Sequence, residues 1–316
     1  MKPKVYIDGK EGTTGLQIYD RLASRDDIEL LLIDETKRKD PDERKKLINA
    51  ADITFLCLPD AASKEVMPLL RPDVKVLDTS TAFRTDAAWD YGFPELKGQK
   101  EKIRNSCRVA VPGCYASGFI SIARPLVELG LVPAEYPFSC TGISGYSGGG
   151  KKMIADYESP DRPAHSKLDA PKSYGLSLGH KHLPEMQKIS GLEKKPMFTP
   201  IVDDYYNGMV VCVPVQAAVS GFQLEPERVQ EMLERHYEGS NFVHVQPLKT
   251  PAEMTATKLS CNDLRDTNQM EIFVFGDAEQ ILLCSRLDNL GKGASGAAVQ
   301  NMNLMLGFDE TAGLTL

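Results

Sequence analysis

The sequence lacks any apolar run close to the ~20 residues that a membrane-spanning helix needs. Its seven cysteines include no CxxC pair. We therefore expect neither a disulfide framework nor a zinc ribbon, and a reducing cytoplasm is the simplest setting. Lys and Arg number 37 against 44 Asp and Glu, a net charge of -7. This balance argues against a nucleic-acid-binding protein with a large basic surface, although a local basic groove is compatible with it.

A chain of 316 residues corresponds to about two domains, at roughly 100–200 residues per domain. Hydrophobic residues make up 42% and charged residues 26%, which is typical of a globular protein and not of a disordered chain. Residues 1–4 lead directly into an apolar segment. This apolar segment, 5–7, is too short for the apolar core of a signal peptide.

Short apolar runs alternate with helical stretches over the first hundred residues. This alternation is typical of a parallel, doubly wound sheet of the Rossmann type. In the first helix we expect Leu16, Ile18, Tyr19 and Leu22 on the buried side. The predicted strands are 5–7, 28–33, 53–58, 74–78 and 108–111, and the predicted helices are 12–22 and 63–70.

Strand candidates outnumber helices after Cys114, which predicts an α+β domain with a mixed or antiparallel sheet. A helix from about Tyr115 should kink near Pro125 and end at Gly130. The other predicted helices are 225–237 and 294–306, and the predicted strands are 138–144, 209–216, 241–246, 271–275 and 280–287.

A glycine-rich turn follows the first predicted strand and opens the first helix. Glycines there allow a tight turn and a close approach of the backbone to a pyrophosphate, and the helix start offers free N–H groups. The spacing differs from the common G-x-G-x-x-G, and a glycine-rich turn without a ligand is the alternative. The predicted phosphate-binding residues are Gly9, Gly12, Thr13, Thr14 and Gly15.

The second predicted strand ends near Asp34, which is followed by Lys37 and Arg38. An acid at this place binds a ribose 2′-hydroxyl and favours NAD, whereas nearby cations favour the 2′-phosphate of NADP. Because the cations outnumber the acid, we predict NADP. A solvated, charged loop is the competing interpretation.

Cys114 stands at a strand end and at a helix start. A helix N-terminus lowers the pKa of a thiol, and the N–H groups of the first turn can stabilise an oxyanion. The sequence therefore predicts a nucleophilic Cys114, with a buried inert thiol as the alternative. By contrast, Cys57, Cys140, Cys212 and Cys284 lie inside apolar runs and are expected to be small buried hydrophobic residues.

Two histidines and a carboxylate lie close together in His180-Lys181-His182-Leu183-Pro184-Glu185. If Pro184 opens a helix, His182 lies near its N-cap and Glu185 in its first turn, where a carboxylate can orient an imidazole. A metal site is the rival interpretation, but no Cys or Asp cluster supports it, and we predict none.

Several side chains are candidates for holding a substrate anion. Arg84 follows the fourth predicted strand, on the edge where ligands bind in such sheets, and can hold a phosphate or carboxylate in a bidentate manner. Ser144 and Ser147, with Lys151 beyond a glycine cluster, form a second candidate group. For each cation, an ordinary surface position is the alternative.

Together these segments resemble the short type of the N-acetyl-γ-glutamyl-phosphate reductase family, within the semialdehyde dehydrogenase superfamily. The blocks occur in family order over nearly the whole chain, and the Pro-Gly-Cys-Tyr, His-x-His-x-Pro-Glu and Lys-Gly-Ala-Ser-Gly blocks are the specific ones. They are Gly9-x-x-Gly12-x-x-Gly15, Leu58-Pro59, Asp78-x-Ser80-x-x-Phe83-Arg84, Pro112-Gly113-Cys114-Tyr115, Ser144-Gly145-x-Ser147-Gly148, His180-x-His182-x-Pro184-Glu185 and Asp288-Asn289-Leu290-x-Lys292-Gly293-Ala294-Ser295-Gly296.

The resemblance implies NADPH-dependent reduction of an acyl phosphate to a semialdehyde in arginine biosynthesis, with Cys114 as the nucleophile. It implies His182, oriented by Glu185, as the acid/base, although His180 is an alternative and a substrate-binding candidate. It further implies Arg84 as a substrate-anion ligand and Asn289 beside the nicotinamide.

The resemblance also implies a domain division. Residues 1–114, completed by 288–316, would form the NADP-binding domain, and residues 115–287 the catalytic domain. Members of the superfamily usually associate through the second domain, so a homo-oligomer, a dimer or a tetramer, is expected.

Two departures and two rival hypotheses stand beside this resemblance. The extra sequence that the long type carries after its second strand is missing. The segment 198–209 lacks the basic residue expected just before Gly208, so the resemblance does not assign that part of the substrate pocket. An aspartate-semialdehyde dehydrogenase would use the same covalent chemistry on another side chain. A dinucleotide-binding regulatory protein would need no activated cysteine.

Overall fold

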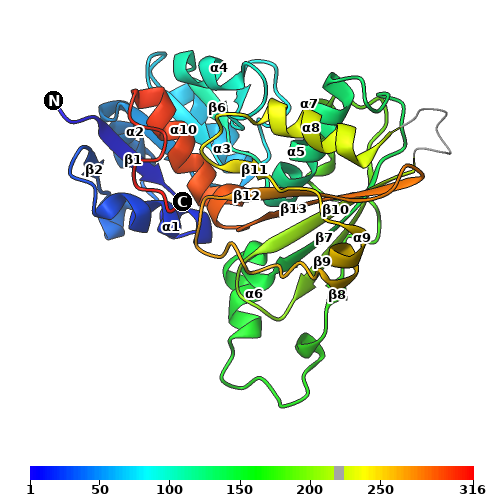
Figure 1. Cartoon of the computed structure of the whole chain (residues 1–316). Helices are drawn as coiled ribbons and strands as arrows, with labels where there is room; N and C mark the ends of the chain where they lie inside the picture. Colours follow the sequence, from blue (N-terminus) through cyan, green and yellow to red (C-terminus); the bar gives the residue numbers. More distant parts are fainter. Residues whose placement is uncertain (217–223) are drawn as a thin grey trace. The chain divides into compact units, whose positions relative to one another are not determined.

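The computed structural model describes residues 1–216 and 224–316. It divides into two compact units, one formed by Met1–Gly113 with Ala294–Thr315, and the other by Cys114–Gly293 with the terminal Leu316. Each unit is built on its own sheet (Figure 1).

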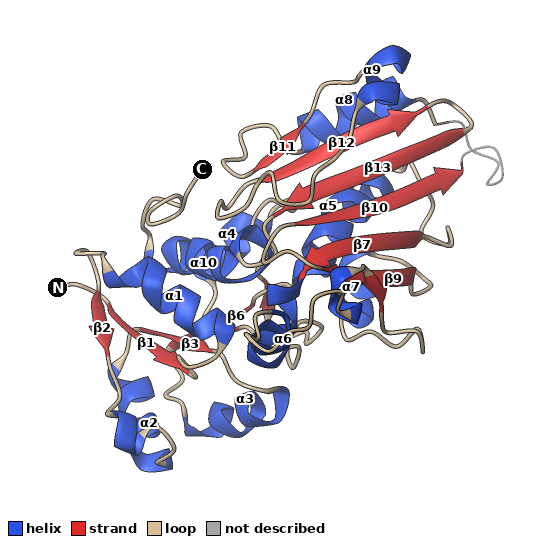
Figure 2. Cartoon of the chain, turned by 90° about the horizontal axis from the view of Figure 1, so that it is seen from below, coloured by secondary structure: helices blue, strands red, loops and turns tan. Residues whose placement is uncertain are grey.

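The first unit contains a parallel six-stranded sheet in the order β2-β1-β3-β4-β6-β5. This confirms the predicted Rossmann-type half of the fold. Helices α1 and α10 lie on one side of the strands, and α2 and α3 on the other (Figure 2). The elements are β1 Lys4–Asp8, α1 Thr13–Ala23, β2 Glu29–Leu31, α2 Pro41–Ala50, β3 Ile53–Leu56, α3 Asp60–Val66, β4 Lys75–Asp78, β5 Asp90–Tyr91, α4 Gln99–Asn105, β6 Arg108–Ala110 and α10 Gly296–Leu306.

The strand β1 shows how the two faces of this sheet are buried. Successive side chains of a strand point to opposite faces. Val5 and Ile7 join the hydrophobic cluster that includes Ile18 of α1, and Tyr6 joins the cluster that includes Ile48 of α2. The prediction that Leu16 lies on the buried side of its helix was wrong, because Leu16 is 45% exposed. Gly15, Ile18 and Leu22 are the buried residues of α1.

The second unit contains a mixed seven-stranded sheet in the order β11-β12-β13-β10-β7-β9-β8. The pairs β11–β12 and β7–β9 are parallel and the others antiparallel, which confirms the predicted mixed sheet. The elements are α5 Cys114–Glu128, β7 Ser139–Gly145, α6 Gly150–Tyr157, β8 Lys172–Ser173, α7 Leu183–Ser190, β9 Met197–Asp203, β10 Met209–Gln216, α8 Pro226–His236, β11 Val243–Val245, α9 Pro251–Ala256, β12 Met270–Gly276 and β13 Gln280–Leu287.

Helix α5 lies on β10 and β13, with α7 and α8 beside it (Figure 1). Gly118 allows this close approach, because a Cβ there would lie 2.7 Å from the hydroxyl of Ser285 and from a methyl group of Val211. The Ser285 hydroxyl in turn donates a hydrogen bond to the Gly118 carbonyl, at 2.9 Å. Pro125 lies inside α5, and the helix ends shortly before Gly130, whose φ is +69°. The N-terminus of α5 is thereby fixed against the sheet.

Within the described ranges 1–216 and 224–316, the structure contains no helix that is both long and apolar enough to cross a membrane.

Candidate active site

Cys114 is the first residue of α5, as predicted, and its side chain is partly accessible. The backbone at Gly293 lies directly against it. A Cβ on Gly293 would come within 2.8 Å of the Cys114 Cβ and 3.2 Å of its Cα. The position of the thiol therefore depends on a glycine that lies far away in the sequence, in the Lys-Gly-Ala-Ser-Gly block.

His182 and Glu185 lie at the start of α7. Pro184 occupies the second helical position, where its missing N–H costs no helical hydrogen bond, and His182 is the N-cap residue. This is the predicted arrangement. Residues three apart on a helix lie on the same side, with Cβ atoms about 5–6 Å apart. Both residues are buried, at 5% exposure for His182 and 1% for Glu185, so the imidazole and the carboxylate are both shielded from solvent.

His180 differs from His182 in its environment. Its Nδ1 accepts a hydrogen bond from the backbone N–H of His182, at 3.2 Å. Burial, with a smaller contribution from the Lys181 ammonium, lowers the pKa of His180 to about 4. The ring is therefore neutral near pH 7, and with Nδ1 as acceptor its proton is on Nε2.

The Tyr115 ring connects the start of α5 to both histidines. Its centroid lies 5.9 Å from the ring centroid of His180 and 6.1 Å from that of His182. The Tyr115 hydroxyl donates to the Ile201 carbonyl at 3.1 Å and accepts from the Tyr174 hydroxyl at 3.3 Å. Because Tyr115 follows Cys114 directly in the chain, this contact brings the nucleophile candidate and the histidine pair into one region of the second unit.

No pattern in the sequence predicts the role of Tyr115. The only signal was its place in the Pro-Gly-Cys-Tyr block. The structure adds a reason for Gly142 of β7, where a Cβ would lie 2.4 Å from a carbon of the Tyr115 ring. Burial raises the pKa of the Tyr115 hydroxyl above its ordinary value, so this group remains a protonated donor.

Asn289 is held by both atoms of its amide group. Its Oδ1 accepts from the Gly208 N–H at 2.8 Å, and its Nδ2 donates to the Ser147 hydroxyl at 3.0 Å. The preceding Asp288 accepts from the N–H groups of Leu290 and Gly291, at 2.7 and 3.2 Å. Asn289 is thereby fixed in the second unit, and its place beside a nicotinamide stays a prediction.

The predicted anion group of Ser144, Ser147 and Lys151 is divided between the interior and the surface. Both serines are buried. The Ser144 hydroxyl donates to the Gly145 carbonyl at 3.2 Å, and the Ser147 hydroxyl accepts from Asn289. Lys151, near the start of α6, is exposed. The two serines fit a structural role around Asn289, and an anion-binding role for Lys151 stays a prediction.

Arg84 lies in the first unit and is 8% exposed. Its Nε donates to the Val111 carbonyl at 2.9 Å, and an Nη donates to the Thr79 carbonyl at 3.1 Å. These bonds tie the ends of two neighbouring strands, β4 and β6, to one guanidinium. Part of the donor capacity of Arg84 is therefore used for the backbone, and its contact with a substrate anion stays a prediction.

The turn between β1 and α1 has the geometry of a phosphate cradle. Gly9 has a φ of +84°, and a Cβ there would lie 2.4 Å from the Cys57 carbonyl oxygen. A Cβ on Gly15 would lie 2.5 Å from the Gly9 carbonyl oxygen. The N-cap Gly12 supplies no side-chain cap to α1, and the hydroxyl oxygen of Thr13 is buried without a hydrogen-bond partner in the described structure. These unsatisfied groups fit an anionic ligand such as a dinucleotide phosphate.

The charged residues after β2 are all exposed. Asp34 caps a short 3₁₀ helix by accepting from the N–H and hydroxyl of Thr36, at 2.8 and 2.6 Å. These bonds hold the pKa of Asp34 below its ordinary value. Arg38 lies 3.8 Å from Glu35. The acid that would favour NAD is thus engaged by Thr36, in agreement with the preference for NADP.

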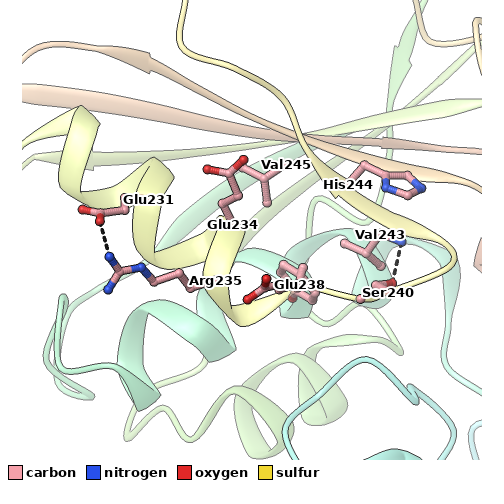
Figure 3. A pocket seen from close by; sticks show the side chains of 10 residues that line it. Glu231, Glu234, Arg235, Glu238, Ser240, Val243, His244 and Val245 are labelled. Atoms are coloured by element: carbon pink, nitrogen blue, oxygen red, sulfur yellow. Dashed lines mark hydrogen bonds and ion pairs between the residues drawn. The ribbon is translucent and has the colours of Figure 1, made fainter.

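A pocket of about 620 Å³ opens beside α8 and β11 in the second unit (Figure 3). Glu231, Glu234 and Glu238 line it, and Arg235 pairs with Glu231 at 2.5 Å. Three glutamates disfavour an anionic ligand such as an acyl phosphate. This acidic pocket shares no residue with the site around Cys114.

Two family models match the chain. The semialdehyde dehydrogenase NAD-binding domain matches residues 4–106, and the semialdehyde dehydrogenase dimerisation domain matches residues 114–289. Among solved structures, aspartate semialdehyde dehydrogenase II from Vibrio cholerae has a TM-score of 0.71 at 19% identity, over 97% of this chain and 99% of that one. The enzyme from Francisella tularensis has a TM-score of 0.70 at 14% identity, over 96% and 100%. The fold and the family models define a semialdehyde dehydrogenase, a class of oxidoreductases.

Closer relatives narrow this class. The chain is 48% identical over 320 residues to N-acetyl-gamma-glutamyl-phosphate reductase 2 of Nostoc sp., with 99% of both chains covered. It is also 48% identical over 315 residues to N-acetyl-gamma-glutamyl-phosphate reductase of Brucella anthropi, with 97% and 99% covered. The chain therefore belongs to the N-acetyl-gamma-glutamyl-phosphate reductase family, as the resemblance predicted, and the hypothesis of a regulatory protein without catalysis is set aside.

Proposed function

We propose that the chain reduces N-acetyl-L-glutamyl 5-phosphate to N-acetyl-L-glutamate 5-semialdehyde and phosphate, with NADPH as reductant and a thioester on Cys114 as intermediate. In arginine biosynthesis this is the reductive step. The observation that carries the proposal is the convergence, around Tyr115, of Cys114 at a helix start with His182 and Glu185 at another. The relatives at 48% identity, named for this reaction, support the choice of substrate.

The first chemical step belongs to Cys114. Its thiolate attacks the acyl phosphate carbon, a C–S bond forms, the C–O bond to phosphate breaks, and phosphate leaves. The first N–H groups of a helix have no partner within the helix, so those at the start of α5 can stabilise the oxyanion of this step. A thiolate is the right nucleophile because far more of it is present near neutral pH than of an alkoxide.

The second step is the reduction of the thioester, for which bound NADPH supplies a hydride. His182 then holds or donates a proton at the developing alkoxide oxygen until the C–S bond breaks and the Cys114 thiolate leaves. Glu185 acts as a positioning residue that orients the imidazole and supports its protonated form. Gly9, Gly12, Thr13, Thr14 and Gly15 would hold the cofactor phosphates, with Lys37 and Arg38 toward the 2′-phosphate and Asn289 toward the nicotinamide.

The same reasoning assigns roles to the two units. The first unit, Met1–Gly113 with Ala294–Thr315, would bind NADP, and the second unit, which begins at Cys114 and includes 288–293, would carry the reaction. A homo-oligomer, a dimer or a tetramer, would form through the second unit, since the matching family model over residues 114–289 is described as a dimerisation domain. The location in the cytoplasm stays a prediction.

The test is the reverse reaction, followed as absorbance at 340 nm with N-acetylglutamate semialdehyde, phosphate and NADP. A phosphate-dependent increase supports the proposal. Aspartate semialdehyde is the parallel substrate, because solved structures of similar fold carry that name. A clear preference for aspartate semialdehyde would overturn the choice of substrate and leave the covalent mechanism intact. Inactivity with both substrates would contradict the proposed reaction.

A further inference from the structure

Asp8 is a buried acid at a place where an acid is unexpected. It ends β1 and directly precedes Gly9, the first glycine of the phosphate-binding turn. Only 3% of the residue is exposed. A carboxylate beside this turn would repel the phosphates of a dinucleotide, because like charges brought together weaken binding. Dinucleotide binding at this turn therefore requires a positive group that neutralises the Asp8 carboxylate.

Arg44, in the first turns of α2, supplies that charge. Its Nη2 lies 2.6 Å from Oδ2 of Asp8, and its Nε lies 3.1 Å from Oδ1 and 3.2 Å from Oδ2. This is the bidentate arrangement that makes Arg–carboxylate pairs strong. The side chain of Arg44 is 22% exposed and that of Asp8 is 4% exposed. The bonds to Asp8 raise the pKa of Arg44, so the guanidinium remains charged.

The Asp8–Arg44 pair lies on a defined face and edge of the sheet. Side chains of β1 at even positions point to the face that α2 and α3 cover, as Tyr6 does. Asp8 follows this alternation, and α2 reaches it from the segment after β2, where an adenosine ribose binds in folds of this type. Arg44 therefore neutralises Asp8 at the carboxyl end of the parallel strands, on the edge where the dinucleotide is expected.

We propose that Arg44 compensates the charge of Asp8 so that the glycine turn can accept dinucleotide phosphates, an inference that rests on the cofactor site proposed above. Arg44 then contributes to binding by neutralising Asp8, and it makes no contact with the 2′-phosphate. NADPH and NADH should then depend on it equally.

The test is a charge cycle of three variants, Arg44→Gln, Asp8→Asn and the double variant, made in the full chain. Dissociation constants for NADPH and for NADH are measured by fluorescence titration at pH 8, so that carboxylates are ionised. Arg44→Gln should weaken both dinucleotides by about tenfold or more, because a single charge remains uncompensated. The double variant should bind both within about threefold of the wild type, and Asp8→Asn should bind them at least as tightly as the wild type.

Arg71→Gln is the matched control. Arg71 is an exposed arginine of the same unit, and its Nε lies 3.6 Å from Oδ1 of Asp73. It precedes β4 and so lies at the amino end of the parallel strands, away from the carboxyl end where Asp8 lies. Its loss removes the same net charge and should leave both dissociation constants unchanged.

Three results would overturn the inference. Arg44→Gln could bind both dinucleotides like the wild type, the double variant could remain as weak as Arg44→Gln, or only NADPH could be weakened. If Arg44→Gln does not fold, weaker binding by Asp8→Asn or by the double variant decides against the inference. None of these results bears on the proposed reaction, which is tested separately by the phosphate-dependent turnover of the wild type and by its choice between the two semialdehydes.

Discussion

His180 accepts the backbone N–H of His182 on its Nδ1, at 3.2 Å, and this bond separates the roles of two histidines that are adjacent in the motif. The acceptor is a neutral ring, because its pKa is lowered to about 4. It satisfies one N–H at the start of α7, where the helix itself offers no partner. The backbone of His182 is fixed by this bond, and the His182 ring lies beside the Tyr115 ring.

The first prediction follows for the two histidines. His182→Asn should lower kcat by about 10²–10⁴-fold, the usual range for general acid–base catalysis. His180→Asn should cost less, because the Asn side-chain carbonyl can replace Nδ1 as acceptor. Glu185→Gln should also cost less, since the imidazole remains. Steady-state kinetics in the reverse direction measure all three, and a His180→Asn variant worse than His182→Asn would assign the acid/base to His180.

A second prediction concerns the stability of the protein in acid. The pKa of His180 is about 4 in the folded protein and near its ordinary 6.5 in the unfolded chain. The unfolded chain therefore binds the proton first as the pH falls, and stability from this group is lost between pH 6.5 and 4. In urea unfolding, His180→Asn should lose less stability than the wild type over this range. Parallel pH profiles for the two proteins would contradict the lowered pKa.

The third prediction is that Cys114→Ser abolishes turnover. An alkoxide is far less available than a thiolate near neutral pH, while a serine fits the same place in α5. Circular dichroism and NADPH titration should match those of the wild type. Cys107→Ser is the control, because Cys107 is an exposed cysteine of the first unit. Appreciable turnover by a homogeneous Cys114→Ser preparation would exclude the covalent mechanism.

The strands of the second sheet show which parts of the fold the sequence predicts well. The predicted strands 209–216 and 280–287 have the observed bounds, because each is mostly apolar and follows a polar or glycine-containing segment, 206–208 and 277–279. The strand β9, Met197–Asp203, was missed. Its Pro200 lacks an N–H and, with Thr199, divides the apolar residues into two short runs, whereas in β10 five consecutive apolar residues precede Pro214. Helix α2 was missed as well, because most of its residues are polar and only Ile48 is buried.

The site was predicted only in part. Local signals predicted that Cys114, His182 and Glu185 lie at helix starts, and the structure confirms these positions, while their catalytic roles stay a prediction. The contacts of Tyr115 with Gly142 and His180 join three distant segments, and no local pattern contains them. The same holds for Arg44, whose partner Asp8 lies thirty-six positions away.

Cofactor preference gives the fourth prediction. If Lys37 and Arg38 contact the 2′-phosphate, replacing both with Gln should narrow the preference for NADPH over NADH by about tenfold or more. Hydrogen bonds to charged groups are worth roughly 1.5–3 kcal/mol. The ratio of kcat/KM for the two cofactors measures this. Lys45→Gln with Lys46→Gln is the control, as both lysines are exposed on α2. An unchanged ratio would mean that other residues hold the 2′-phosphate.

The last prediction concerns Gly293. A Cβ there would lie 2.8 Å from the Cβ of Cys114 and 3.1 Å from the Asp288 carbonyl oxygen, so Gly293→Ala must displace the nucleophile or the backbone behind it. Reaction rates fall steeply when a reacting group moves by about 1 Å, and we expect kcat to fall by roughly 10–100-fold. Gly179→Ala is the control, because a Cβ at that position would lie 3.5 Å from the Ser177 hydroxyl, an ordinary contact. Alkylation of Cys114 by iodoacetamide, followed by mass spectrometry, should also change its rate in Gly293→Ala and not in Gly179→Ala. Wild-type turnover and alkylation in Gly293→Ala would show that the thiol does not depend on this contact.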